Sequence, residues 1–152
     1  MKKGQVAMLD LLMAVFLFLI VVGGSVVLWH KYNNKLVENI IYEDLEIKGL
    51  QVSDLLIRNE GKPSGWEKNL SSVEVLGLAD TDRQLSSDKV DALGNLSYNK
   101  AVKLLNLDGY EFYLEVGNFN YGLEPNGQYV VNVQRAVIYN GVPEVIEVAV
   151  WE

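Results

Sequence analysis

The sequence predicts an α+β protein in which a long apolar N-terminal helix precedes a small head. Residues 11–29 carry no charged side chain, and a helix of this length spans about 28 Å, the hydrocarbon thickness of a membrane. Apolar residues at helical spacing follow this segment. From Tyr110 onward, apolar and polar residues alternate as in a half-buried strand, and Asn-Gly pairs mark turns. These patterns predict an antiparallel sheet of at least three strands, with short helices, after the long helix.

Composition and charge exclude several classes of function. The chain has 152 residues, enough for about one domain, and its 13 basic and 20 acidic residues give a formal charge of −7. A nucleic-acid partner is not expected, because phosphate binding needs a basic surface. Cysteine is absent, and the single histidine, His30, lies at the end of the apolar segment. We therefore expect no thiolate or histidine metal site, no Ser-His-Asp triad, no cofactor and no enzymatic activity.

The apolar N-terminal segment predicts a single-pass anchor in the cell membrane. Lys2 and Lys3 precede it, and the positive-inside tendency places this end in the cytoplasm and the head outside the cell. The alternative is a secretory signal that is cleaved near the small residues 23–25. We favour the anchor because apolar residues continue to Trp29, whereas a secretory signal usually turns polar soon after its cleavage site.

The first residues resemble a known processing signal. The string MKKGQ at residues 1–5, followed by an acidic residue and a long apolar helix, is similar to the class III signal of archaeal type IV pilin-like proteins. In that family a prepilin-type signal peptidase cuts after the glycine, which implies a leader of residues 1–4, a cut after Gly4 and a mature chain that begins at Gln5. The resemblance also implies that residues 5–32 both anchor the protein in membrane lipid and pack against other pilin-like subunits.

Asp10 is the acidic residue of this pattern. The family pattern has glutamate at the fifth mature residue, whereas Leu9 holds that position here and Asp10 is the sixth. An ionised carboxylate among apolar helices is costly unless it is paired. In one interpretation the freed α-amino group of a neighbouring subunit pairs with Asp10 and sets the stagger between subunits. In the other, Asp10 marks the cytoplasmic edge of the span and stays hydrated.

A second helical pattern covers residues 33–60, as a separate amphipathic helix or as a continuation of the first. Apolar positions spaced four or seven residues apart share one of its faces: Val37, Ile41, Leu45, Val52 and Leu56. Gly49 weakens the middle of this helix and is a place where it can bend. Gly61, with Pro63 two residues later, predicts its C-terminal end.

Residues 61–152 are predicted to form the head. A Gly-x-Pro-x-x-Trp turn that ends at Trp66, a Gly-Leu-Ala segment and a Leu-Ser-x-x-Lys-Val helix start also resemble archaeal pilin-like proteins, and the resemblance implies no catalytic role. We expect Trp66 to pack its loop onto the head; the alternative is that its ring stacks on a ligand. Serines at 86–87 and Ser97 predict the starts of two short helices, which end near residues 93 and 105.

Two Asn-Leu-Ser sequons lie in the head, at Asn69 and Asn95. Each is a candidate N-glycosylation site if the head is exported. Ser97 of the second sequon is also the predicted cap of a helix.

Three strands are predicted at residues 110–116, 128–139 and 145–151. Asn126-Gly127 predicts the turn into the second strand and Asn140-Gly141 the turn into the third. Because Pro143 follows the latter pair closely, we expect that loop to be slightly longer than two residues. Four residues of the first strand share one face: Tyr110, Phe112, Leu114 and Val116. Three residues of the last strand are expected to face the core: Ile146, Val148 and Val150.

Two functional hypotheses follow. The first is a structural or minor pilin-like subunit, anchored in the membrane, that assembles through its N-terminal helix into a surface filament or an envelope complex. The alternative is a single-pass surface protein whose head binds a sugar, a peptide or a partner protein. It is suggested by aromatic residues in loop-like contexts: Trp66, Tyr98 and Tyr121. A membrane-tethered hydrolase using a carboxylate pair is disfavoured, because the acidic residues are scattered and no motif has metal or phosphate spacing.

Overall fold

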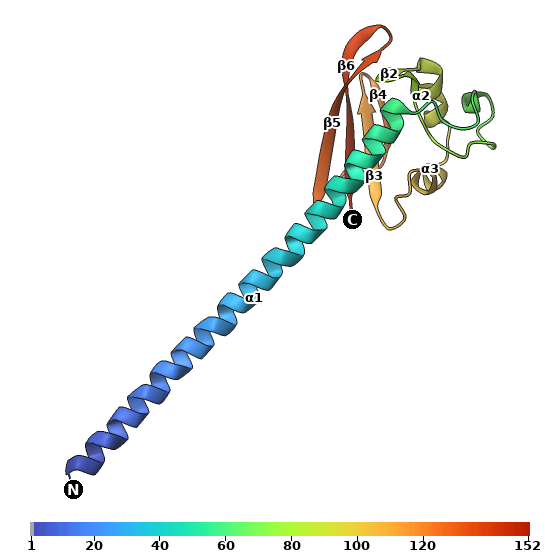
Figure 1. Ribbon diagram of the computed structural model, residues 1–152. Coiled ribbons are helices and arrows are strands. Elements are labelled where there is room, and N and C mark those ends of the chain that lie inside the picture. The colour runs from blue at the N-terminus through green and yellow to red at the C-terminus, as the bar shows by residue number, and fades with distance from the viewer. Residues whose placement is uncertain (1) are drawn as a thin grey trace. The chain divides into compact units, whose positions relative to one another are not determined.

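The computed structural model describes the backbone of residues 2–152 and the side chains of residues 7–152 (Figure 1). The chain divides into two compact units, residues 1–40 and residues 41–152, and we refer to the second unit as the head. The elements in chain order are α1 (Lys2–Arg58), η1 (Trp66–Lys68), β1 (Ala79–Thr81), β2 (Gln84–Leu85), α2 (Ser87–Gly94), α3 (Tyr98–Leu104), β3 (Glu111–Val116), β4 (Phe119–Gly122), β5 (Val130–Tyr139) and β6 (Val142–Trp151).

The helix α1 runs from Lys2 to Arg58, so the second helical pattern continues the first rather than forming a helix of its own. The helix contains no proline, and its N-terminal half is rich in leucine and other apolar residues. In the described part of the chain, α1 is the helix long and apolar enough to cross a membrane. The predicted apolar helix of membrane-spanning length is therefore confirmed.

The end of α1 is paired by the main chain of the loop that follows it. The amide of Leu78 donates a hydrogen bond of 2.9 Å to the carbonyl of Leu56, and the amide of Arg83 donates one of 2.8 Å to Ile57. These bonds satisfy carbonyls that have no partner within the helix. The loop between α1 and β2 is thus attached to the last turn of α1.

The head is built on a six-stranded sheet with the strand order β1-β2-β5-β6-β3-β4. The three strands predicted from the sequence correspond to β3, β5 and β6, which pair antiparallel at its centre. The short strands β1, β2 and β4 were not predicted, and β2 pairs parallel with β5, so the sheet is mixed. The α+β class is confirmed.

One face of the sheet is buried beneath helices. In β3 the side chains of Phe112, Leu114 and Val116 are fully buried, as the period of two predicts. Their partners in β6 include Ile146 and Val148, which are also buried. These strands share one core with the last turns of α1 and with α2 and α3. The opposite face carries polar residues such as Glu115 and Glu147, and at one end it carries the buried Ala149 and Trp151.

At Gly49, α1 lies in close contact with the sheet. A Cβ atom at this position would lie 2.8 Å from Cγ2 of Val133 in β5, closer than side-chain carbons pack. The helix continues through Gly49 to Arg58. The glycine does not interrupt the helix, and it allows close packing of α1 against β5.

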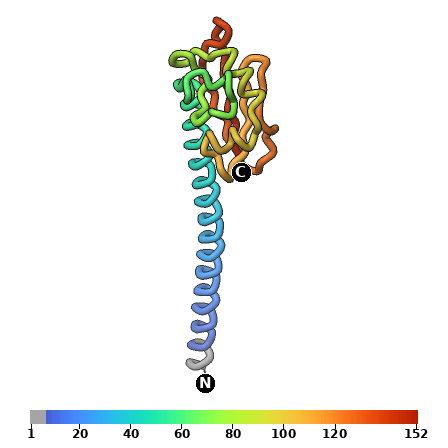
Figure 2. Tube along the Cα trace, turned by 90° about the vertical axis from the view of Figure 1, so that its right-hand side faces the viewer, coloured from blue at the N-terminus to red at the C-terminus, as the bar shows by residue number. Residues whose placement is uncertain are grey.

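The two Asn-Gly pairs have different structures. Asn140 and Gly141 have φ of 53° and 78° and join β5 to β6 in a two-residue turn, with Tyr139 paired to Val142. The expectation of a longer loop is wrong, because Pro143 already belongs to β6, where it is paired with Ile138 of β5. The hairpin tip extends past the other turns of the head (Figures 1 and 2).

Asn126-Gly127 does not form a hairpin turn. It lies in the connection from β4 to β5, and these strands are not neighbours in the sheet. A Cβ atom at Gly127 would lie 2.6 Å from Cδ1 of Trp151, which is 2% exposed. The prediction of a turn directly into the second strand is wrong, because this glycine instead lets the connection lie against Trp151.

The two short helices begin where the serines predict. Ser86 is the N-cap residue of α2, and Ser97 is that of α3. Neither serine makes a side-chain capping bond, but their carbonyls accept the first helical hydrogen bonds, from Val90 and Ala101, at 3.1 Å each. The helices end at Gly94 and Leu104, within one residue of the prediction.

Candidate functional site

The described part of the first unit is a helix with an unburied apolar surface. Each side chain from Ala7 to Ile40 is exposed, including large ones such as Leu12 at 57% and Trp29 at 68%. An apolar surface of this extent requires lipid or other protein around it, because burying one large apolar side chain contributes about 1.5–3 kcal/mol. This surface is the first candidate functional site.

Asp10 is an exposed acidic residue on this helix. The residues three and four positions away, which are its neighbours on the helix surface, are uncharged: Val6, Ala7, Met13 and Ala14. No residue within one turn can therefore neutralise the carboxylate. The predicted processing site at Gly4 and Gln5 lies outside the residues whose side chains are described.

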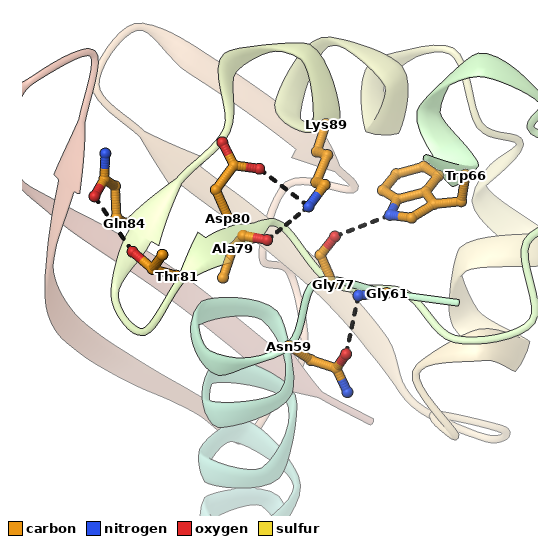
Figure 3. A network of polar contacts seen from close by, with 9 residues as sticks. All are labelled: Asn59, Gly61, Trp66, Gly77, Ala79, Asp80, Thr81, Gln84 and Lys89. Atoms are coloured by element: carbon orange, nitrogen blue, oxygen red, sulfur yellow. Dashed lines mark hydrogen bonds and ion pairs between the residues drawn. The ribbon is translucent and has the colours of Figure 1, made fainter. Parts of the chain in front are cut away.

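Trp66 is an internal packing residue of the head. Its side chain is fully buried, and Nε1 donates a hydrogen bond of 3.1 Å to the carbonyl of Gly77 (Figure 3). Gly61, with φ of 83°, approaches the ring so closely that a Cβ atom there would lie 2.4 Å from Nε1. The prediction that Trp66 packs its loop onto the head is confirmed. The stacking alternative is wrong, because neither face of the ring is accessible.

Lys89 is a buried basic residue of the same region, with 7% of its surface exposed. Its ammonium group donates to the carbonyl of Ala79 at 2.7 Å and lies 3.1 Å from Oδ1 of Asp80 (Figure 3). These contacts attach α2 to β1. A buried ammonium group needs such partners, so we interpret this cluster as structural.

Tyr98 and Tyr121 are half-buried and use their hydroxyl groups inside the head. The hydroxyl of Tyr98 donates to the carboxylate of Glu111 and accepts from the amide of Phe112 at 3.0 Å. The hydroxyl of Tyr121 donates to the carbonyl of Leu96 at 2.8 Å. The idea that these tyrosines are exposed loop residues is therefore wrong: Tyr98 begins α3, and Tyr121 belongs to β4.

These two tyrosines make the stability of the head sensitive to alkaline pH. Burial raises the pKa of Tyr121 to about 12. Burial, together with the hydrogen bond to Glu111, raises the pKa of Tyr98 well above its usual value. Because both pKa values are higher in the folded chain, their contribution is complete below about pH 10, the unfolded pKa, and is lost as the pH rises through the folded values.

We expect the free energy of unfolding of the head to fall between about pH 10 and pH 12. In the double variant Tyr98→Phe, Tyr121→Phe the fall should be shallower, because neither ring then ionises. Denaturant unfolding at a series of pH values measures this difference. Tyr32→Phe, which changes an exposed tyrosine of the first unit, is the control. If the free energy of unfolding fell equally steeply with pH in the double variant and in the control, Tyr98 and Tyr121 would not be the source of the alkaline sensitivity.

The two sequons have different local structures. At Asn69 the side-chain oxygen accepts a hydrogen bond of 3.2 Å from the amide of Ser71, and the side-chain nitrogen makes no hydrogen bond to the residues described. At Asn95 the side-chain nitrogen donates to the carbonyl of Asp91 at 3.0 Å, and the next residue, Leu96, is buried. Glycan transfer requires the side-chain nitrogen, which only the first site leaves available.

We therefore expect Asn69, and not Asn95, to carry a glycan when the chain is exported in a cell that modifies sequons. The variant Asn69→Gln should lose the added mass, and Asn95→Gln should keep it. Mass spectrometry of the intact protein and of its peptides measures both. A glycopeptide that contains Asn95 would contradict the expectation.

A cleft of about 370 Å³ opens at the hairpin end of the sheet. It exists because β3 pairs with β6 only as far as Ile146, so residues 142–145 of β6 extend beyond β3. Helix α2, the turn between β3 and β4, and the hairpin of β5 and β6 all contribute to its walls. The lining residues are Asp91, Gly117, Asn118, Phe119, Tyr139, Asn140, Val142 and Glu144.

Glu144 is the residue of this cleft that the sequence could have revealed. It continues the stripe of Ile146, Val148 and Val150 at a period of two, so it occupies a core-facing position with a charged side chain. The register agrees, because Glu144 pairs with the buried Val137. The other polar residues of the cleft are brought together only by the fold.

Among the residues whose side chains are described, no group of three or more histidine, aspartate or glutamate residues is placed to hold a metal ion. The single histidine, His30, is exposed on α1.

Comparison with known proteins provides no family assignment. No protein-family model, no curated protein and no solved structure matches the chain. The observed organisation is a long apolar N-terminal helix followed along the chain by a small α+β head. Beyond that organisation, the likeness to pilin-like proteins depends on the residues of the sequence alone.

Proposed function

We propose that this chain is a structural or minor pilin-like subunit, anchored in the membrane, that assembles through its N-terminal helix into a surface filament or an envelope complex. The observation that carries the proposal is the exposed apolar surface of residues 11–29, which precedes a folded head. Other subunits and lipid are the two environments that can cover such a surface. The short basic leader supports the same proposal through its resemblance to archaeal class III signals.

In this proposal a prepilin-type signal peptidase removes residues 1–4, and Gln5 becomes the first residue. The N-terminus faces the cytoplasm and the head lies outside the cell. The carboxylate of Asp10 pairs with the freed α-amino group of a neighbouring subunit. The absence of charged neighbours within one turn of Asp10 favours a partner from outside its own helix.

The test is to express the full chain together with a prepilin-type signal peptidase, with Gly4 intact or replaced in Gly4→Leu. We expect wild-type protein in sheared surface material to begin at Gln5. The Gly4→Leu chain should keep its leader and be missing from that material. N-terminal sequencing and immunoblotting of the sheared fraction measure both results.

Gly24→Ala is the matched control, because a Cβ atom at Gly24 has no described atom within 4 Å. This variant should be processed normally. A native chain that starts near residue 26 and is recovered from the medium would instead establish a secretory signal and refute the proposal. Asp10→Asn, in the same assay, should be processed but poorly incorporated; normal incorporation would favour the hydrated-edge interpretation of Asp10.

A single-pass surface protein with a ligand-binding head is the second candidate. The cleft at the hairpin end of the head is the observation that favours it, in place of the aromatic residues that first suggested it. Binding in this cleft is compatible with assembly through α1. Recovery of ligand binding without any surface assembly would favour this candidate over the first.

A further inference from the structure

We propose that the cleft at the hairpin end of the head is a binding site for a neutral sugar ring. The site is composed of Asp91, Asn118, Asn140 and Glu144 as polar groups, with Phe119, Tyr139 and Val142 as apolar lining. Its volume of about 370 Å³ falls in the usual range of small-molecule sites, roughly 300–1,000 Å³. The inference goes beyond assembly, since no part of it depends on the N-terminal helix.

The polar groups of the cleft are available to a ligand. Among the described residues, the carboxylates of Asp91 and Glu144 have no basic side chain within 4.0 Å and accept no protein hydrogen bond. The side-chain amides of Asn118 and Asn140 likewise make no hydrogen bond to the described protein. The cleft therefore presents two acceptor groups and two groups that both donate and accept.

The fold holds Glu144 and the aromatic lining of the cleft in fixed places. Glu144 and Tyr139 belong to the paired part of the β5–β6 hairpin, next to the buried Val137. Phe119 is packed against α2, where a Cβ atom at Gly94 would lie 3.2 Å from Cε2 of the ring. Gly117, with φ of 57°, turns the chain beside Tyr139. A Cβ atom at Gly117 would lie 3.7 Å from Cδ1 of the Tyr139 ring. Sites on rigid elements hold their geometry better than sites on loops.

Charge excludes anionic ligands. Two carboxylates lie in the cleft, and no basic residue lines it. Nine of the 13 basic and 18 of the 20 acidic residues lie in residues 41–152, which gives the head a formal charge of −9. A phosphate, a sulfate or an acidic sugar would be repelled at short and long range.

The mixture of groups favours a sugar over a simple cation. A cation would use the carboxylates and the amide oxygens, but it would leave the amide N–H donors without a partner. A neutral sugar ring has hydroxyl groups that donate to carboxylates and accept from amides. Its C–H face can pack on aromatic rings and on an aliphatic side chain such as Val142, which burial from water stabilises.

The experiment uses the full chain, labelled with nitrogen-15 and held in a phosphocholine detergent, because glycoside detergents would compete. Methyl glycosides of glucose, galactose and mannose are titrated while amide resonances are recorded. We expect saturable shifts for at least one glycoside, confined to residues 117–119 and 139–144. Methylammonium chloride and calcium chloride are titrated separately as cation probes.

Glu144→Gln and Glu147→Gln form a matched pair, because each removes one negative charge from β6. Glu144 lines the cleft, whereas Glu147 lies on the other face of the sheet. Glu144→Gln should weaken glycoside binding about tenfold or more, the usual effect of losing a charged hydrogen-bond acceptor. Glu147→Gln should leave binding unchanged. If Glu144→Gln fails to fold, Asn118→Ala, at an exposed turn, should show the same weakening.

The proposal is overturned if no glycoside shifts the cleft resonances, or if both glutamine variants bind alike. Saturable shifts with methylammonium or calcium alone would also overturn it and would identify a cation site. Because the readout is ligand binding by the head, failure here leaves leader processing and surface assembly unaffected.

Discussion

Replacing Trp66 with alanine should lower the free energy of unfolding of the head by about 3–5 kcal/mol, the range for removing a buried tryptophan. The side chain is fully buried, and its indole nitrogen bonds the carbonyl of Gly77. The variant leaves a cavity and an unpaired carbonyl where the loop after α1 folds back on the head. Denaturant unfolding of the full chain in detergent, followed by near-ultraviolet circular dichroism, measures the change.

Two further variants serve as controls for Trp66→Ala. Trp66→Phe retains most of the ring but loses the Nε1 donor, so it should cost less than Trp66→Ala. Trp29→Ala changes an exposed tryptophan of the first unit and should leave the unfolding of the head unchanged. A Trp66→Ala variant as stable as the wild type would show that the loop is not part of the cooperative fold of the head.

Deleting residues 2–29 should transfer the protein from the membrane fraction to the soluble fraction. The deletion removes the charge-free segment and most of the exposed apolar surface that requires lipid or partners. The head should remain folded, because its core comes from residues 45–150. Fractionation with immunoblotting, and near-ultraviolet circular dichroism of the soluble product, measure both outcomes.

The control is the double variant Val21→Leu, Val22→Leu, which changes the sequence of the apolar segment but keeps its length and hydrophobicity. This variant should stay in the membrane fraction. If the deleted chain remained with the membrane, the head itself would bind it, and α1 would not be the anchor. If the deleted chain were soluble but unfolded, residues 2–29 would contribute to the stability of the head.

Several elements could be predicted because short-range patterns determine them. The absence of charge from residues 11–29 predicts an apolar helix of membrane-spanning length without further information. The alternation that buries Phe112, Leu114 and Val116 defines β3, since a strand with one buried face has a period of two. Ser86 and Ser97 mark the starts of α2 and α3, because these positions depend on residues within one turn.

Other elements could not be predicted, because pairing between distant segments decides them. The strands β1, β2 and β4 have three, two and four residues, too few to show a period. Two identical Asn-Gly pairs differ in structure: one joins neighbouring strands, and the other passes Trp151 between strands that are not neighbours.

The sequence by itself determined the long apolar helix, the α+β class and the central strands, because hydrophobic length and period are properties of adjacent residues. Only the tertiary structure decided that Gly49 serves close packing, that Trp66 is inaccessible and that Asn118 and Tyr139 line one cleft with Glu144. Those facts depend on which segments meet across the sheet, and strand order is set by the packing of the whole head rather than by any local pattern.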